Sequence, residues 1–312
     1  MDNAMLRDMM GQPWAILPST LSALIERVKA GADLSEFGSA AIPRNTARQP
    51  GAVAVLPLMG IIHQRRSPIE DMLGISIGTS TEAFAEQLRR AIDSPEVKAI
   101  VIDVDSPGGT VAGVQELSDE IFKLRGTKPI VAVSDALNAS AAYWISSQVD
   151  ELIVTPSAII GSIGIIVAHE DLTGAAEQAG VKVTLFSAGE FKTVGHEMEP
   201  VTDETAALVQ GMVDDQYANF VGAVARGRGV SVAAVRAGFG KGFVLTAKAA
   251  VRQGVADRVA TLRETLIRLG APEGSAEATE RRSMRRMAAS PTAELEIERE
   301  KAAVAAGDEV TT

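Results

Sequence analysis

The sequence contains no cysteine, and this absence excludes three kinds of chemistry. Without a thiol the chain can form no disulfide framework, no thiolate nucleophile and no Cys-ligated zinc site. The absence is also compatible with a reducing compartment, in which disulfides do not persist.

The chain also lacks a positive net charge and a long apolar run. Its formal net charge is -10, whereas binding to nucleic-acid phosphates requires a clustered basic surface. The N-terminus, MDNAMLRDMMGQPW, carries acidic residues where a signal peptide has a basic region, and no apolar run of about 18 residues follows it. We expect a cytoplasmic protein without a membrane anchor or a nucleic-acid partner.

What the sequence does contain is a large apolar fraction, 46% of 312 residues, which is ample for a packed core. Residues 1–50 hold one helical pattern, at Leu21, Leu24, Ile25 and Val28 behind a possible N-cap at Ser19, and we expect a helical appendage outside the core. Residues 51–269 form the predicted catalytic domain. Residues 270–312 have no aromatic residue and many alternating charges, which predicts a flexible tail with a helical stretch around 293–306.

Within residues 51–269, short apolar strands alternate with amphipathic helices, a pattern typical of an α/β domain. The predicted strands cover 52–58, 98–104, 129–133, 151–154, 164–167 and 181–186. A first predicted helix begins with a capping box of Thr79 and Glu82. Three further helices are predicted at 114–124, 140–148 and 203–226, and two shorter ones begin at Ser231 and Thr246. Continuous Val/Ile runs in the strands predict a parallel sheet buried on both faces.

Two features of this pattern can serve acyl transfer. Ser140 stands among small residues at a strand-to-helix junction, and the backbone N–H of Ala141 follows it at the start of the helix. Gly108 and Gly109 follow another buried strand, where backbone N–H groups can approach a ligand without side-chain obstruction. Together these N–H groups could form an oxyanion hole, although an N-cap serine and a glycine turn are also ordinary structural features.

A nucleophilic serine needs a base, and the sequence offers two kinds. His63, His169 and His196 stand in three different contexts, none with a recognisable acidic partner, and we expect neither a catalytic histidine nor a metal site from them. Lys192 lies between two apolar side chains, Phe191 and Val194, in a loop after a predicted strand, where burial could lower the lysine pKa toward neutrality. A solvated surface lysine is the alternative interpretation of the same local sequence.

The order of these features resembles the signal peptide peptidase A family, the serine peptidases of family S49, over about residues 52–259. The likeness is carried by the blocks Ser140–Ile145, Gly161–Gly164 and Gly189–Lys192, with Asp150 and Pro156 between them. The resemblance implies a Clp protease/crotonase-like fold of stacked ββα units, and it implies no cofactor and no metal.

Carried over by position, the resemblance makes Ser140 the nucleophile, Lys192 its general base and Ser162 a serine that orients the lysine amine. It places the oxyanion hole at Gly108, Gly109 and Ala141. The family usually has two glycines after the nucleophile, whereas this chain has Ala141 and Ala142; alanine keeps the N–H donor but changes the shape of the pocket.

The resemblance further implies a polypeptide substrate and a homo-oligomer with active sites near subunit interfaces. The charged segment after residue 269 favours the phage head-maturation proteases of the family, so the substrate could be a scaffold or capsid protein or the chain's own tail, in the host cytoplasm or the procapsid. Three alternatives stay open at this stage: a cellular protease of the same family, a crotonase-type acyl-CoA enzyme, and an inactive scaffold protein.

Overall fold

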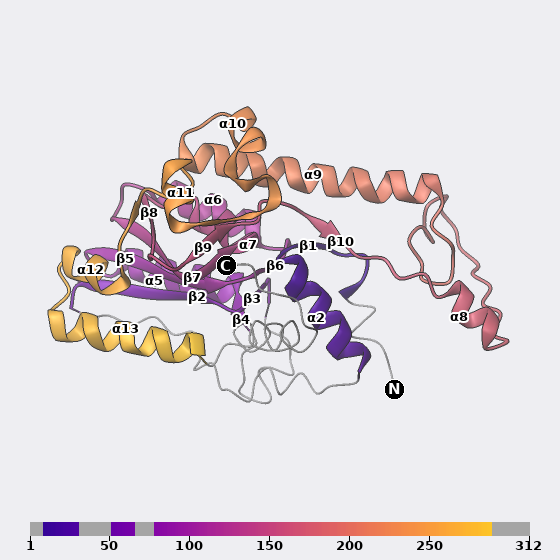
Figure 1. Cartoon of the computed structure of the whole chain (residues 1–312), viewed down its shortest axis with the longest axis horizontal. Coiled ribbons are helices and arrows are strands. Elements are labelled where there is room, and N and C mark those ends of the chain that lie inside the picture. The colour runs from indigo at the N-terminus through magenta and orange to yellow at the C-terminus, as the bar shows by residue number, and fades with distance from the viewer. Residues whose placement is uncertain (1–8, 31–50, 66–77, 289–312) are drawn as a thin grey trace, which may run out of the picture.

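The computed structural model describes residues 9–30, 51–65 and 78–288, which fold into two sheets and a set of covering helices (Figure 1). The larger sheet contains β2 (Val53–Met59), β5 (Ala99–Ser106), β7 (Ile130–Ala139), β8 (Glu151–Val154), β9 (Ile159–Gly161), β11 (Val244–Thr246) and β12 (Arg258–Val259). The smaller sheet contains β1 (Pro13–Ile16), β3 (Ile61–His63), β4 (Gly78–Ser80), β6 (Gly108–Thr110) and β10 (Ile166–Val167).

The larger sheet has the strand order β11-β9-β7-β5-β2, with β8 beside β7 and β12 beside β8. All its pairings are parallel except the antiparallel pairing of β11 with β9. Strands β2 and β5 are buried along their whole length, which is why they appear in the sequence as continuous apolar runs. The predicted α/β fold class is therefore confirmed.

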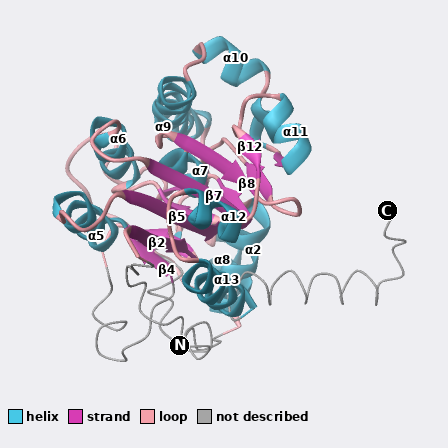
Figure 2. Cartoon of the chain, turned by 90° about the vertical axis from the view of Figure 1, so that its left-hand side faces the viewer, coloured by secondary structure: helices cyan, strands magenta, loops and turns pink. Residues whose placement is uncertain are grey.

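Helices cover both faces of the larger sheet (Figure 2). The helices of the described residues are α2 (Pro18–Lys29), α5 (Thr81–Asp93), α6 (Val114–Leu124), α7 (Ala141–Ser146), α8 (Thr173–Gln178), α9 (Asp203–Arg228), α10 (Val232–Ala237), the 3-10 helix η1 (Phe239–Gly242), α11 (Ala247–Arg252), α12 (Leu262–Arg268) and α13 (Glu273–Ala288). On one face α5, α6, α7 and the end of α9 enclose the main core; on the other, α12 and α13 pack over β2, β5 and β7. Each face of the sheet thus has its own apolar cluster.

The N-terminal segment is part of the smaller sheet, contrary to the predicted appendage outside the core. That sheet has the order β10-β1-β6-β3-β4, so β1 is an internal strand. Trp14, Ala15 and Ile16 are all buried. Helix α2 begins at Pro18, one residue before the predicted N-cap Ser19, because proline is well suited to the first helical position.

Several local features within residues 51–269 differ from the prediction. Residues 181–186 form no strand and are mostly exposed, and the predicted strand 164–167 is reduced to β10. The three-residue strand β9 was too short for its pattern to be recognised. The N-cap of α5 is Ser80, whose hydroxyl accepts from the Ala83 N–H at 3.3 Å, while the Thr79 hydroxyl donates to the Met59 carbonyl at 2.8 Å.

The predicted flexible tail is helical as far as residue 288. Helix α13 buries small side chains, Ala276, Thr279 and Ser283, against the sheet, and the Ser283 hydroxyl donates to Asp103 Oδ2 at 2.7 Å. A small-residue stripe of this kind gives no large apolar signal in the sequence. The predicted helical stretch around 293–306 lies outside the described residues.

Helix α9 is buried at one end only. Its residues from Phe220 onward pack into the main core, whereas no residue between 203 and 219 is buried. That exposed half, together with α8 and the chain that joins them, projects away from the sheets (Figure 1). Among the helices of the described residues, none has both the length and the apolar run needed to cross a bilayer.

Candidate active site

The candidate site lies where β5, β7 and β9 end side by side. Ser106 at the end of β5 is opposite Asn138, and Ala139 at the end of β7 is opposite Gly161. Ser140 and Ser162 follow directly after that last pair. Because parallel strands present their carboxyl ends at one edge of a sheet, the structure brings these two serines and the Gly108 turn together.

Ser140 has a strained backbone at the junction between β7 and α7. Its φ is 56°, a region that non-glycine residues rarely adopt and that typically costs about 1–3 kcal/mol. Its N–H donates to the Gly161 carbonyl at 2.8 Å, which holds the residue against β9. The Ser140 side chain is fully buried, and its Oγ has no hydrogen-bond partner among the described residues. An unpaired hydroxyl on a strained strand-to-helix turn is an arrangement that suits a nucleophile.

Gly108 lies against Ser140 and has room for no side chain. Its φ is +98°, and an added Cβ would lie 2.2 Å from the Ala15 carbonyl oxygen and 3.0 Å from the Ser140 Cβ. Its N–H donates to the Ser106 hydroxyl at 3.1 Å, and that hydroxyl donates to the Gly60 carbonyl at 2.7 Å. Ser106 therefore orients the turn that carries Gly108, a predicted oxyanion donor. Ser106 was not identified as a site residue from the sequence.

Gly109 and Ala141 are the other predicted oxyanion donors. Gly109 stands between β1 and β3, opposite Ala15 and Ile62, and an added Cβ would lie 1.9 Å from the Ile62 carbonyl oxygen. Ala141 is the first residue of α7, where a backbone N–H has no partner within the helix. The side chains of Ala141 and Ala142 belong to the main core, which accounts for alanine in place of glycine.

Ser162, like Ser140, has a positive φ. Its φ is 54°, its N–H donates to the Phe243 carbonyl at 3.1 Å, and it is buried. The two serines occupy equivalent positions after two paired strands. The sequence suggested both residues, but it could not show that each of the two strands is followed by a serine with a positive φ.

Lys192 is not beside Ser140 within one chain. It is exposed, in the segment between α8 and α9, and its N–H donates to the Gly189 carbonyl at 3.2 Å. Figure 1 shows this segment at the far end of α9 from α7. The structure therefore groups Gly108, Gly109, Ser140, Ala141 and Ser162 and separates Lys192 from them.

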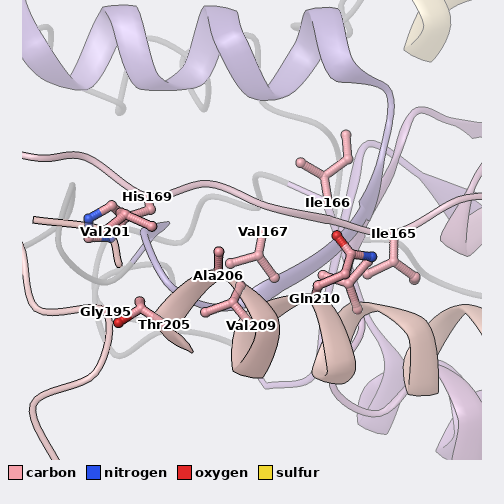
Figure 3. A pocket seen from close by; sticks show the side chains of 11 residues that line it. Ile165, Ile166, Val167, His169, Gly195, Val201, Thr205, Ala206, Val209 and Gln210 are labelled. Carbon is pink, nitrogen blue, oxygen red and sulfur yellow. The ribbon is translucent and has the colours of Figure 1, made fainter. Parts of the chain in front are cut away.

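No histidine of the described residues replaces the lysine. His63 Nδ1 lies 3.2 Å from the Ile61 carbonyl, and His196 Nδ1 accepts from the Met198 N–H at 3.1 Å. His169 lies in a cavity of about 310 Å³ beside β10 (Figure 3). The described part of the chain also contains no group of three His, Asp or Glu side chains that could hold a metal ion.

The cavity of Figure 3 is mainly apolar and lies at the base of the projecting segment. Its lining comes from the β10 region, from the segment between α8 and α9, and from the exposed half of α9: Ile165, Ile166, Val167, His169, Gly195, Val201, Thr205, Ala206, Val209, Gln210 and Val213. It contains none of the predicted site residues.

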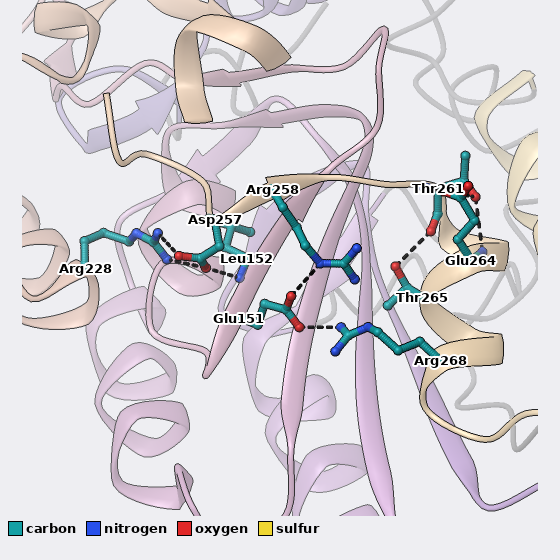
Figure 4. A network of polar contacts seen from close by, with 9 residues as sticks. All are labelled: Glu151, Leu152, Arg228, Asp257, Arg258, Thr261, Glu264, Thr265 and Arg268. Atoms are coloured by element: carbon teal, nitrogen blue, oxygen red, sulfur yellow. Dashed lines mark hydrogen bonds and ion pairs between the residues drawn. The ribbon is translucent and has the colours of Figure 1, made fainter. Parts of the chain in front are cut away.

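A separate polar network fixes the elements that follow the site (Figure 4). Arg228 donates to both oxygens of Asp257, at 2.6 and 3.0 Å, and Asp257 also accepts from the Leu152 N–H at 2.7 Å. Partial burial raises the pKa of Asp257, but these hydrogen bonds outweigh burial and hold the pKa below its ordinary value. Glu151 bonds both Arg258 and Arg268, which ties β8 to β12 and α12. This network joins structural elements and does not reach Ser140.

Comparison with known proteins places this geometry in context. Residues 123–273 match peptidase family S49, a range that includes Ser140, Ser162 and Lys192. Capsid assembly protease C of Escherichia phage lambda is 32% identical over 183 residues, which are 59% of this chain and 41% of that protein. A putative protease of Methanocaldococcus jannaschii is 31% identical over 173 residues, 55% of each chain. The chain thus spans about half, or less, of the length of these relatives.

Among solved structures, a ClpP1 mutant from Listeria monocytogenes aligns with 67% of this chain and 94% of its own length. The TM-score of that alignment is 0.42 and the sequence identity is 14%.

Proposed function

The chain belongs to peptidase family S49, and from that premise we propose that it is a serine endopeptidase with Ser140 as nucleophile and Lys192 as general base. The observation that carries the proposal is the state of Ser140. Its buried, unpaired hydroxyl is held in a strained turn against Gly108, a residue that tolerates no side chain. An ordinary N-cap serine would instead bond the backbone of its own helix, and Ser140 makes no such bond.

In the proposed reaction Ser140 Oγ attacks the carbonyl carbon of a peptide bond. The neutral amine of Lys192 takes the hydroxyl proton and passes it to the departing amine, which leaves an ester between Ser140 and the substrate. Water then attacks the ester, with the lysine again accepting a proton, and releases the acid and free Ser140. In the proposal the oxyanion of each tetrahedral intermediate accepts hydrogen bonds from the N–H groups of Ala141 and the Gly108–Gly109 turn; the Gly108 N–H must exchange its bond to the Ser106 hydroxyl for the oxyanion.

The lysine of one copy serves the serine of a neighbouring copy in this proposal. Lys192 and Ser140 are separated within the chain, so the site is incomplete without a second subunit. The projecting segment that carries Lys192 exposes large apolar side chains that a monomer would keep in water: Val181, Val183, Phe186, Phe191, Val201, Leu208 and Met212. Phe186 is 94% exposed. Packing this surface on a second copy would also desolvate the lysine amine, which favours its neutral form.

The polypeptide substrate and the biological role are proposed from the relatives. The likeness to a phage capsid assembly protease favours a role in head maturation, with a scaffold or capsid protein, or residues 289–312 of the chain itself, as substrate. The similarly distant archaeal relative keeps a cellular protease as the second candidate. Capsid and portal genes beside this gene would support the first role, and their absence would support the second.

Labelling with a fluorophosphonate probe, followed by peptide mapping, tests the nucleophile. We expect modification of Ser140 in the wild-type assembly and none in Ser140→Ala. Lys192→Ala should abolish both labelling and peptide turnover, whereas the matched control Lys182→Ala, an exposed lysine of the same projecting segment, should keep both. If the wild-type assembly is folded but Ser140 stays unlabelled at about pH 8, the proposal fails in favour of an acyl-CoA enzyme or an inactive scaffold.

A further inference from the structure

Strand β1 lies inside the candidate active site. It is the middle strand between β6 and β10 and is antiparallel to both. Strand β6 is the one that carries Gly108 and Gly109, and Figure 1 shows β1 beside β6, β10 and α7. The chain's own N-terminal segment therefore covers the strand next to Ser140.

Ala15 is the residue of β1 that faces the nucleophile. A Cβ added to Gly108 would lie 2.2 Å from the Ala15 carbonyl oxygen and 3.0 Å from the Ser140 Cβ. The Ala15 carbonyl and the Ser140 side chain therefore lie against the same face of Gly108. The Ala15 side chain belongs to the apolar cluster of Ala141 and Ala142, whereas Trp14 and Ile16 belong to a different cluster. Strand alternation thus directs the small side chain toward the site and the two large ones away from it.

The N-terminal segment has its own small core, separate from the main one. The five buried members of this cluster, Met9, Trp14, Ile16, Leu21 and Leu24, all come from residues 9–24. The Trp14 indole N–H also stays within the segment, because it donates to the Met9 carbonyl at 2.9 Å. Among the buried residues of β1, only Ala15 belongs to the main core, so the segment could leave the sheet as a unit and withdraw one small side chain from that core.

The backbone of β1 occupies hydrogen-bonding edges that a bound peptide would need. The Leu17 N–H donates to the Pro107 carbonyl at 2.9 Å, and the Val111 N–H donates to the Pro13 carbonyl at 3.2 Å. Among the described strands, β10 pairs with β1 alone. A peptide added to a sheet edge uses the same backbone groups, and an edge can pair with only one strand at a time.

We propose that β1 is an internal competitor of the polypeptide substrate: it fills the strand position between β6 and β10, and it must leave before a substrate can reach Ser140. The ligand of that position is an extended peptide with a small side chain facing Ser140 between two large apolar neighbours, as in Trp14-Ala15-Ile16. This inference rests on the proposed function for the role of Ser140, but occupancy of the strand position can be measured without catalysis.

Binding of a fluorescent peptide with the sequence of residues 9–18, MMGQPWAILP, tests the competition. The peptide is titrated against the full chain carrying Ser140→Ala, alone or combined with Trp14→Ser, which removes the main anchor of β1. We expect Trp14→Ser to tighten peptide binding about tenfold, because apparent affinity falls with the fraction of sites that β1 occupies. The control Leu266→Ala weakens the apolar cluster that α12 and α13 form on the larger sheet, which contains no residue of β1. It should leave the affinity for the peptide unchanged. A peptide carrying Ala15→Arg should not bind.

Hydrogen exchange of the Ser140→Ala chain gives a second measurement if Trp14→Ser does not fold. Saturating peptide should speed exchange of the chain's own Leu17 amide about tenfold, because its bond to Pro107 is lost when β1 leaves. Peptide that binds while the Leu17 amide keeps its protection overturns the inference, and so does equal affinity for the chains with and without Trp14→Ser. A third outcome separates this inference from the proposed function. If the Trp14→Ser chain binds peptide more tightly but the fluorophosphonate probe labels Ser140 in no chain that retains this serine, β1 still competes with peptide. The proposed protease function is then wrong.

Discussion

At the scale of single residues, the site depends on backbone positions more than on side-chain pairs. Ser140 and Ser162 both have a positive φ after paired strands, and Gly108 completes the turn beside them. Such strain persists only where surrounding structure enforces it. Here the Ser140 N–H is held by Gly161 and the Ser162 N–H by Phe243.

Gly108→Ala should inactivate the site. The new Cβ would meet the Ala15 and Ala139 carbonyl oxygens and the Ser140 Cβ within 3.1 Å, so the turn must move and the predicted oxyanion donor with it. We expect a loss of at least about 2 kcal/mol of stability and a loss of fluorophosphonate labelling. Gly126→Ala is the control: its φ is also positive, +77°, but nothing lies within 4 Å of the added Cβ. It should cost only about 1–2 kcal/mol and keep labelling. Equal labelling in both variants would contradict the role given to Gly108.

The Asp257 carboxylate should make stability depend on acid pH. Its pKa is held below the ordinary value in the folded chain, so its ionised form contributes stability above the unfolded pKa of about 3.9. That contribution is lost as the pH falls through the lower, folded pKa. Asp257→Asn should therefore destabilise the chain at neutral pH, by about 1–3 kcal/mol, with a difference that shrinks below about pH 4. Urea denaturation at several pH values measures it, and a difference independent of pH would contradict the assignment.

At the scale of elements, the unexpected structure lies at both ends of the chain. Both β1 and α13 were placed outside the core from the sequence, and both pack on it. Each presents small side chains to its partner, Ala15 in the strand and Ala276, Thr279 and Ser283 in the helix. Close packing of small residues stabilises through fit, which a count of large apolar residues does not detect.

A charge on the buried face of α13 should therefore be costly. Ala276→Asp places a carboxylate in the cluster with Leu262 and Leu266, and we expect a loss of about 2–4 kcal/mol in free energy of unfolding. Ala278→Asp makes the same substitution on the exposed face of the helix and should change stability by less than about 1 kcal/mol. Denaturant titration of the two variants compares them directly. Equal effects would mean that α13 does not pack on the sheet in solution.

At the scale of the whole molecule, the separation of Ser140 from Lys192 makes assembly part of the proposed chemistry. The exposed apolar side chains of the projecting segment supply a surface for a second copy, and closed symmetric assemblies are the usual outcome of such contacts.

Mixing two inactive variants tests whether the site is shared. Ser140→Ala keeps the lysine and Lys192→Ala keeps the serine, so a mixed assembly should contain some sites with both groups. With random mixing we expect about one quarter of wild-type peptide turnover. As a control, the Lys192→Ala chain in the mixture is replaced by a double variant that carries both Ser140→Ala and Lys192→Ala. This mixture contains no Ser140 and should show no peptide turnover. If mixed assemblies form on size exclusion but stay inactive, the base does not come from a neighbouring copy.

Much of the fold and part of the site followed from the sequence. Continuous apolar runs predicted the buried strands around β2, β5 and β7, and 3.6-residue periodicity predicted α5 and α6, because burial on both faces or on one stripe imposes these patterns locally. The order of the motif blocks suggested Ser140, Ser162, Lys192 and the glycine turn.

The tertiary structure alone decided which of these residues meet. Strand order at the sheet edge places Ser106, Gly108, Ser140 and Ser162 together, and the length of α9 carries Lys192 away from them. It also places β1 across Ser140, although about ninety residues separate it from β6 in the sequence. The apolar pattern of a segment shows which of its own side chains are buried. Contacts between distant segments depend on strand pairing, which no single segment specifies.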